Sequence, residues 1–357
     1  REGGSIMTIL RESLNQPGRQ ARLTALETLL HEERGRGDLP TRCDDDANNH
    51  IHTFYSFSPY SPTQAVYQGY RTGLPAVGIV DHDTLSGAVE FKRAAALVGI
   101  GSTVGVEMRV RFDRGFGILN NPDQPDCMYM VAHGVCQNNI DAFNAYLAPY
   151  RAHREERNRR MCETLRRLLL PSGIDLSYDL DVRSLSHAIE GGSVTERHIL
   201  FAVAIKLENR YGRTPELTEF LRTTLAIDLS MKQEKQLTDP KNEWFRYDLL
   251  GALKTNTRPY YIPADREMPD ATDFVAKAQA FGAIPCYAYL GDVAESVTGD
   301  KRAQHFEDSY LDRLIGELKS IGVPAITYMP TRNTSAQLSR IGNLCVQNDL
   351  LQISGED

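Results

Sequence analysis

The sequence predicts an α/β fold, a TIM-like barrel with a helical insertion and an N-terminal helical extension. Short apolar runs alternate with helical stretches, and these runs resemble strands buried on both faces of a parallel sheet. Histidines and carboxylates follow several of the runs directly. Strand signals almost vanish between residues 137 and 268. Because barrels place their active sites at the carboxyl ends of the strands, this scatter of polar residues favours a barrel, and an open doubly wound sheet remains the alternative.

The individual elements are expected from apolar runs and from helical spacing. A first helical region over residues 5–34 places Leu23, Leu26 and Leu30 on one face, before glycines and a proline break the pattern. Further helices are expected over 86–97, 271–281, 310–321 and 336–348. Strands are expected over 76–80, 104–112, 128–132, 283–289, 324–329 and 350–354.

Four segments follow from this pattern. We expect an N-terminal helical extension over 1–45, a first part of the barrel over 46–136, a helical insertion that caps the substrate over 137–268, and a second part of the barrel over 269–357. Within the insertion, helices are expected over 139–170 and 193–211, the second opened by a capping box of Ser193 and Glu196. The chain opens at Arg1 and ends abruptly at Asp357, so we expect it to be an excerpt that is truncated at its C-terminus.

Composition narrows the class of protein. The chain has 357 residues and a formal net charge of −7, which argues against broad nucleic-acid binding because such proteins usually carry a basic excess. The apolar runs are too short to span a bilayer, and no secretory signal is recognisable. The six cysteines form no C-x-x-C pair, which predicts reduced thiols and a cytoplasmic protein. The oligomeric state does not follow from the sequence.

Six residues at expected strands or strand ends are candidate metal ligands. His50 and His52 are separated by one residue, so on a strand both imidazoles point to the same face. His82 follows an apolar run, and the neighbouring Asp81 is a candidate ligand, an orienting group or a turn former. Glu107 lies inside an apolar strand, where a lone carboxylate would be costly without a cation. His133 and Asp357 each follow a further apolar run.

Each of these residues also has a simpler explanation, as a packed histidine or a turn former. Together they place four histidines and two carboxylates on one rim, and this donor set suits Zn²⁺, Mn²⁺ or Fe²⁺. The sequence therefore predicts a divalent metal site.

The motifs resemble those of the PHP (polymerase and histidinol phosphatase) domain family, in its metal-dependent phosphoesterase branch. The residues that carry the resemblance are His50-Ile51-His52-Thr53 with Ser56, then Asp81-His82-Asp83-Thr84, then Glu107 and His133. The resemblance covers roughly residues 48–136 and 270–357, and it extends to parts of the helical insertion. There, Arg151, Arg154 and Arg157 and the segment 195–198 resemble parts of PHP phosphoesterases that act on small phosphorylated molecules. Alternatively, these arginines form a solvent-exposed face of their helix and have no role in the site.

The resemblance implies a distorted (β/α)₇ barrel and a metal cluster at its mouth. His50, His52, Glu107 and Asp357 would complete one site. A second site would keep Glu107 and His133, and a third would retain little besides His82. Phe57 and Tyr289 stand where the family usually has ligands, which reduces the expected number of metals. The last motif begins at Asp357, and its histidine position lies beyond the sequence.

The implied activity is hydrolysis of a small phosphoester, a nucleotide or a sugar phosphate, by water that the metal activates. His82, Arg197 and His198 are the candidate catalytic residues. Arg197 and His198 would grip phosphate or protonate the leaving group, and solvent-facing residues at a helix start are their alternative. Two other functions remain open: a degenerate barrel that serves as a binding or regulatory module, and an exonuclease on nucleic acid.

Overall fold

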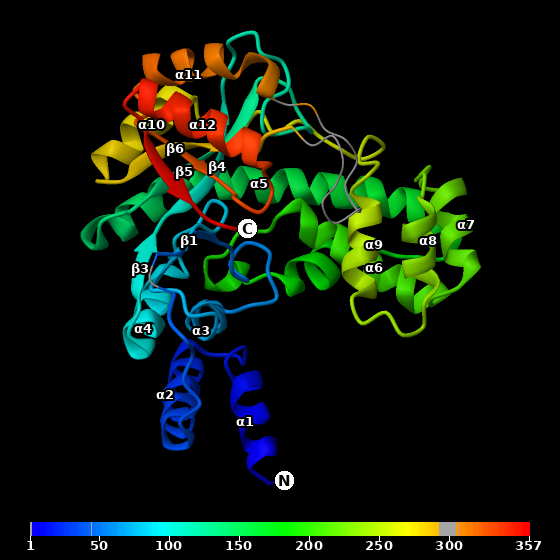
Figure 1. The fold of residues 1–357 in the computed structure, drawn as a ribbon. Helices are drawn as coiled ribbons and strands as arrows, with labels where there is room; N and C mark the ends of the chain where they lie inside the picture. The colour runs from blue at the N-terminus through cyan, green and yellow to red at the C-terminus, as the bar shows by residue number, and fades with distance from the viewer. Residues whose placement is uncertain (1, 44, 293–304, 306) are drawn as a thin grey trace.

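The computed structural model describes residues 2–43, 45–292, 305 and 307–357. They form a mixed α/β fold with two sheets, which lie side by side, and a helical lobe to one side (Figure 1). The three-stranded sheet has the order β1-β2-β3, and the five-stranded sheet the order β4-β5-β6-β7-β8. The strands are β1 Ala47–Ile51, β2 Ala76–Ile79, β3 Gly101–Val104, β4 Val106–Arg111, β5 Cys127–His133, β6 Ile284–Tyr289, β7 Ala325–Tyr328 and β8 Leu351–Ser354.

The expected strand over 104–112 is divided between the two sheets. β3 pairs in parallel with β2, whereas β4 belongs to the larger sheet, and Gly105 lies between them. A Cβ on Gly105 would stand 2.6 Å from the carbonyl oxygen of Ala132, so only glycine allows this close approach. After this break, an isolated parallel bridge between His82 and Glu107 continues from the end of β2 to β4. The bridge brings two predicted site residues together.

The expectation of an all-parallel sheet was wrong for β5. This strand runs antiparallel to both β4 and β6, whereas β6, β7 and β8 are parallel. Residues 112–126 between β4 and β5 contain no helix, and without a helical crossover the chain returns in the opposite direction. At the other side, side chains join β1 to the chain around the end of β8: Asn49 donates to the carbonyl of Ser354, and Asn48 to that of Glu356, both at 3.1 Å.

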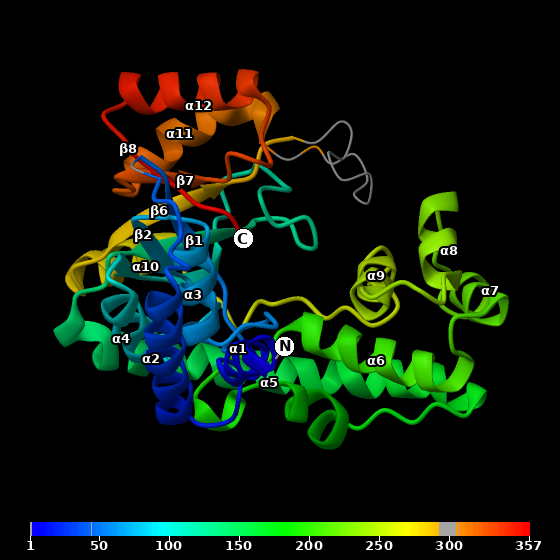
Figure 2. The same cartoon turned by 60° about the horizontal axis from the view of Figure 1, so that its bottom comes forward.

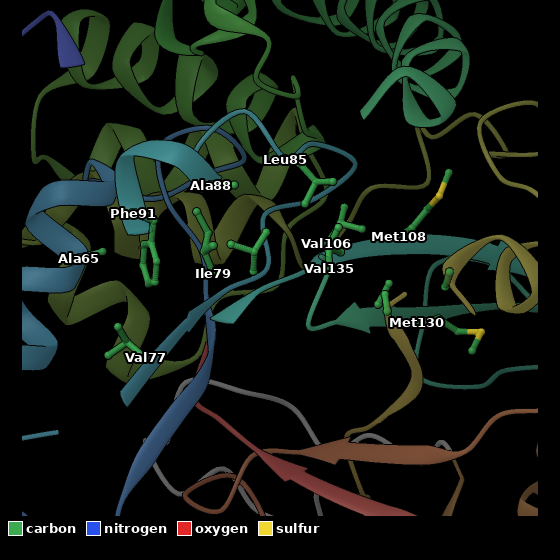
Figure 3. Close-up of a cluster of buried hydrophobic side chains, with 14 of the residues drawn as sticks. Ala65, Val77, Ile79, Leu85, Ala88, Phe91, Val106, Met108, Met130 and Val135 are labelled. Atoms are coloured by element: carbon green, nitrogen blue, oxygen red, sulfur yellow. The ribbon is translucent and has the colours of Figure 1, made fainter. Parts of the chain in front are cut away.

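Helices cover the sheets and supply their core. α3 (Pro62–Arg71) and α4 (Ala88–Val98) pack against β2, and Figure 3 shows Phe91 of α4 beside Ile79 of β2. The same core continues through Val106 of β4 to Met130 of β5, all of them fully or almost fully buried. α10 (Ala271–Ala280), α11 (Leu311–Ser320) and α12 (Ser335–Gln347) cover the larger sheet.

The N-terminal helical region is two helices rather than one. α1 (Glu2–Ser13) and α2 (Arg19–Arg36) are separated by a turn at Pro17 and Gly18, where Gly18 has a φ of 91°. A proline lacks the backbone donor that a continuous helix needs, which explains the break. α2 is tied to the sheet-covering helix α4 by a buried ion pair, 2.6 Å from Arg22 Nη2 to Glu90 Oε2.

The helical lobe has a hydrophobic core of its own. It consists of the long helix α5 (Ile140–Leu169), which starts beneath the sheets, and of α6 (Glu196–Tyr211), α7 (Pro215–Thr223), α8 (Met231–Thr238) and α9 (Phe245–Leu253). Figure 2 shows α6 lying along α5, with α7, α8 and α9 beyond them. Its core includes Met161, Leu200, Val203, Leu221 and Leu249.

Two smaller findings concern the whole described chain. None of its described helices is both long and apolar enough to cross a membrane. All six cysteines are free thiols, four of them buried, while Cys43 and Cys136 are exposed.

Candidate metal centre

His50 and His52 converge at the carboxyl end of β1. His50 lies in the strand and His52 directly follows it, and both are buried. Their ring centroids are 5.2 Å apart, so the one-residue spacing does bring both imidazoles to one place.

Glu107, the second residue of β4, points at these histidines. Its Oε1 lies 3.8 Å from His50 Nε2, and its Oε2 lies 3.4 Å from His52 Nε2. The ligand atoms of the three residues all lie within 4.8 Å of one another. Burial alone would raise the pKa of Glu107, but the imidazoles of His82, His50 and His52 hold it well below its usual range. The carboxylate is therefore charged, as a metal ligand has to be.

His82 and His133 extend the cluster from β2 and β5. The His82 ring stacks on His52 with 4.6 Å between centroids, and its Nδ1 lies 3.3 Å from Glu107 Oε2. His133 ends β5, and its buried Nε2 has no hydrogen-bond partner among the described residues. Burial, and then repulsion from His50, lowers the pKa of His133 to about 3. A neutral imidazole with a free lone pair is suited to bind a metal.

Asp357 lies against the same group, with its Oδ1 3.4 Å from His52 Nε2. Burial would lower the pKa of His52, but the carboxylates of Asp357 and Glu107 outweigh it and raise the pKa to about 9. The surroundings of His52 therefore favour a positive charge. Convergent imidazoles, two carboxylates and the orphaned nitrogen of His133 together fit a divalent cation.

Asp81 and Ser56 orient His52 from behind. Ser56 Oγ donates to Asp81 Oδ1 at 2.7 Å and lies 3.3 Å from His52 Nδ1. Because the single hydroxyl proton goes to the carboxylate, Nδ1–H of His52 donates to Ser56 and leaves Nε2 to face Glu107. Thr53 also donates to Asp81, through its backbone nitrogen and its hydroxyl, at 2.6 Å each. Of the three roles open to Asp81, the structure favours that of an orienting group.

Phe57 and Tyr289 are the two residues that depart from the family motifs. Phe57 makes a ring contact, and Tyr289 makes a hydrogen bond. Phe57 packs edge-on against His198, with 5.0 Å between ring centroids. The hydroxyl of Tyr289 donates to Asp308 Oδ1 at 2.6 Å. None of the hydrogen bonds, ion pairs or ring contacts among the described residues links either side chain to His50, His52 or Glu107.

Arg197 and His198 lie in the first turn of α6, and they have different roles. The N-cap is Thr195 rather than Ser193, and His198 takes the place expected for Glu196, since its Nδ1 accepts from the backbone nitrogen of Thr195 at 3.0 Å. The predicted capping box was therefore shifted by two residues. His198 is buried here, and the structure does not bring it into the metal group.

Arg197 is close enough to the metal group to affect its electrostatics. Desolvation would raise the pKa of Asp357, whose side chain is 42% exposed, but His52 and then Arg197 bring it down to about 2. Burial also lowers the pKa of His82, and the charge of Arg197 acts in the same direction.

A buried ionic network beneath the centre was missed by sequence reasoning. Arg154 Nη1 lies 2.7 Å from Asp83 Oδ2, and Arg157 Nε lies 2.6 Å from Glu267 Oε2. Arg109 Nη1 lies 2.7 Å from Glu267 Oε1. The solvated-face alternative is thus wrong for Arg154 and Arg157, which are 3% and 5% exposed.

The family comparison agrees with this geometry. Residues 48–188 match the model of the PHP domain, and the segment contains His50, His52, His82, Glu107 and His133. The match covers 141 of the 357 residues, so the likeness to the PHP domain holds for this segment. The match includes the start of the helical lobe as well as the sheet region that carries the histidines.

Sequence relatives match a short part of this chain. A 5'-3' exoribonuclease of Haemophilus influenzae is 37% identical over 71 residues, which are 20% of this chain and 26% of the relative. An error-prone DNA polymerase of Mycobacterium bovis is 39% identical over 82 residues, 22% of this chain and 7% of the polymerase. The matched region is thus about a quarter of the first relative and much less of the second.

Two solved structures are similar over most of their length. One is described as a metal-dependent phosphoesterase from Bifidobacterium adolescentis, with a TM-score of 0.57, 21% identity, and coverage of 89% of this chain and 88% of that one. The other is an amidohydrolase from Chromobacterium violaceum, with bound sulfate and no metal. Its TM-score is 0.58, its identity 19%, and the coverage 87% and 86%. At this level of identity the likeness establishes a shared fold.

Proposed function

We propose that this protein is a metal-dependent hydrolase of small phosphoesters, such as a nucleotide or a sugar phosphate. The observation that carries the proposal is the convergence of His50, His52 and Glu107, whose ligand atoms lie within 4.8 Å of one another. The match of residues 48–188 to the PHP domain supports it. A distorted barrel formed by the two sheets, with its mouth at this cluster, is part of the same proposal.

His50, His52, Glu107 and Asp357 would hold one cation, and His133 would contribute to a second that shares Glu107. Zn²⁺, Mn²⁺ and Fe²⁺ suit this mixture of imidazole and carboxylate donors. When bound, such an ion polarises a phosphoryl oxygen and lowers the pKa of a coordinated water.

The protein's own residues would bind and orient the substrate. Arg197 acts electrostatically on Asp357 and His82, and its positive charge can pair with a phosphate oxygen. Asp81 and Ser56 hold His52 in the orientation that leaves Nε2 facing Glu107. The helical insertion over 137–268 serves as a substrate cap, since its helix α6 carries Arg197 and His198, and His198 packs against Phe57, the residue after Ser56.

Exonuclease activity on nucleic acid is the second candidate, and the sequence relatives favour it. One is named a 5'-3' exoribonuclease and others are error-prone DNA polymerases. The net charge of −7 opposes it, because nucleic-acid binding draws on a basic surface. Binding of single-stranded DNA or RNA that weakens steeply with salt would favour this candidate over a small substrate.

A degenerate binding module is the third candidate, and Phe57 and Tyr289 are its support. Phenylalanine cannot ligate a metal, and the hydroxyl of Tyr289 donates to Asp308, so a reduced site is consistent with binding without turnover.

The test is hydrolysis of an aryl phosphate and of a panel of phosphoesters by the purified chain with Mn²⁺ or Zn²⁺. We expect turnover that a chelator abolishes and that Glu107→Gln lowers at least about 100-fold, because the variant loses the central charged ligand. A variant at an exposed carboxylate, Glu27→Gln on α2, is the matched control and should keep full activity. Metal bound to the wild type without any turnover on the panel would support the binding module instead.

A further inference from the structure

A cavity of ≈ 170 Å³ lies between the loop that follows His52 and the helical lobe. The loop contributes residues 54 and 57–59, and the lobe contributes residues of α6 and α9. The lining residues are Phe54, Phe57, Ser58, Pro59, Leu185, His198, Phe201 and Tyr247. For scale, an apolar cavity of about 150 Å³ is large enough to bind benzene.

The walls of this cavity are aromatic and interlocked. Phe57 and Phe201 meet at nearly right angles with 5.8 Å between ring centroids, and Phe201 lies 5.3 Å from Tyr247. Phe54 is held on its outer sides, stacked on His187 at 3.6 Å and beneath the guanidinium of Arg22 at 5.0 Å. These contacts restrict the rings, so the cavity is formed before any ligand enters. Rigid ring walls favour a flat, apolar guest that can stack or pack edge to face.

Both walls of the cavity contain residues that are close in sequence to residues of the candidate site. On the loop, Phe57 directly follows Ser56, whose hydroxyl contacts His52. On α6, Phe201 follows Arg197 by four residues, so the two residues share a helix face about 6 Å apart along the axis. The same helix thus offers the positive charge of Arg197 for a phosphate and, one turn later, the ring of Phe201 for an organic group.

We propose that this cavity binds a planar aromatic ring in the organic part of the phosphoester whose phosphate lies at the metal centre. The inference rests on the proposed function and deepens it, because it selects aromatic phosphoesters over sugar phosphates. Ser58 and Tyr247 place hydroxyl groups at the lining, where they can bond to polar atoms on the edge of a ring. A saturated or small organic group would gain little from these walls.

The experiment compares the affinity of the metal-loaded protein for phenyl phosphate, cyclohexyl phosphate and methyl phosphate, measured as the Michaelis constant for a probe that is hydrolysed and by calorimetry for one that is not. The three probes share the phosphate and differ in the ring. We expect phenyl phosphate to bind about three- to tenfold more tightly than cyclohexyl phosphate, and methyl phosphate to bind most weakly.

Three variants separate the ring contacts from general damage. Phe201→Leu should reduce affinity for phenyl phosphate about three- to tenfold and leave methyl phosphate unchanged, whereas Phe201→Tyr should retain the preference. Phe220→Ala is the control, because it removes a buried ring from the same lobe that does not line the cavity.

The outcomes separate this inference from the proposed function. Equal affinities for phenyl and cyclohexyl phosphate, unaffected by Phe201→Leu, would overturn the assignment of the cavity even if phosphoesters are hydrolysed. An aromatic preference that depends on Phe201, in a protein without any phosphoesterase turnover, would support the cavity while the proposed function fails.

Discussion

Arg154 and Asp83 form a buried ion pair that joins the helical lobe to the metal centre, with 2.7 Å between Nη1 and Oδ2. Arg154 belongs to α5, and Asp83 directly follows the predicted ligand His82. Asp83 has a positive φ of 56°, and Arg151 donates to its backbone carbonyl at 2.7 Å. Two arginines of the lobe thus fix the turn on which His82 is held.

We predict that Arg154→Met lowers the free energy of unfolding by about 3–5 kcal/mol, because it leaves the buried carboxylates of Asp83 and Glu267 without this partner. Arg159→Met is the matched control on the same helix. Arg159 pairs with Asp179 at 2.6 Å, but the two side chains are 46% and 59% exposed, so the loss should stay below about 1 kcal/mol. Urea unfolding followed by circular dichroism measures both, and equal effects would contradict the role given to burial.

We predict that Ser56→Ala weakens metal binding about tenfold, because His52 loses the partner that fixes its Nδ1 proton. Competition with a chromogenic chelator measures the dissociation constant directly. Ser58→Ala is the control: its hydroxyl accepts only from the backbone of Tyr60, at 3.3 Å, among the hydrogen bonds of the described residues. An affinity for metal that Ser56→Ala leaves unchanged would show that packing alone orients His52.

The convergence at the metal centre could be predicted because it depends on local rules. Alternation along β1 brings His50 and His52 to one face, and apolar runs that end in His82 and His133 indicate strand ends. The role of Glu107 could be predicted from the cost of burying a charge, because a carboxylate inside an apolar strand requires a partner. These rules involve only neighbours in sequence or a shared sheet edge.

What could not be predicted depends on partners far away in the sequence. The arginines of α5 read as a solvated face, and their burial requires Asp83 and Glu267, which lie 71 and 113 residues from Arg154. The antiparallel direction of β5 depends on the connection before it, and an apolar run carries no information on strand direction. At α6, Ser193 and Thr195 are both suitable N-cap residues, and in the structure Thr195 caps the helix.

We predict that a divalent metal raises the thermal stability of the wild type. A ligand present at about 100 times its dissociation constant stabilises the folded state by about 2.7 kcal/mol, provided that it does not bind the unfolded chain. Glu107→Gln should lose most of this gain, because its neutral amide cannot replace the charged ligand between His50 and His52. Differential scanning calorimetry with Mn²⁺, and again after a chelator, tests it. A gain that persists in Glu107→Gln would place the metal elsewhere.

The pH dependence of the unfolding free energy tests the ionisation of Glu307, a buried residue outside the metal centre. Its carboxylate is fully buried; it accepts from the hydroxyl of Tyr287 and from the backbone nitrogens of Leu290 and Gly291, the latter two at 2.7 and 2.9 Å. Burial outweighs these hydrogen bonds and raises the pKa of Glu307 to about 7. The folded state therefore holds a proton that the unfolded chain releases at a lower pH.

We predict that Glu307→Gln gains stability relative to the wild type as pH rises from about 4.5 to about 7. Across this window the unfolded wild type binds fewer protons at residue 307 than the folded one, so folding of the wild type weakens with rising pH, by up to about 3 kcal/mol from this group. The variant has no such proton, and its amide oxygen can still accept from Leu290 and Gly291. Unfolding free energies of both proteins at pH 5, 6 and 8 give the difference. A constant difference across this range would mean that the carboxylate is already ionised at pH 5.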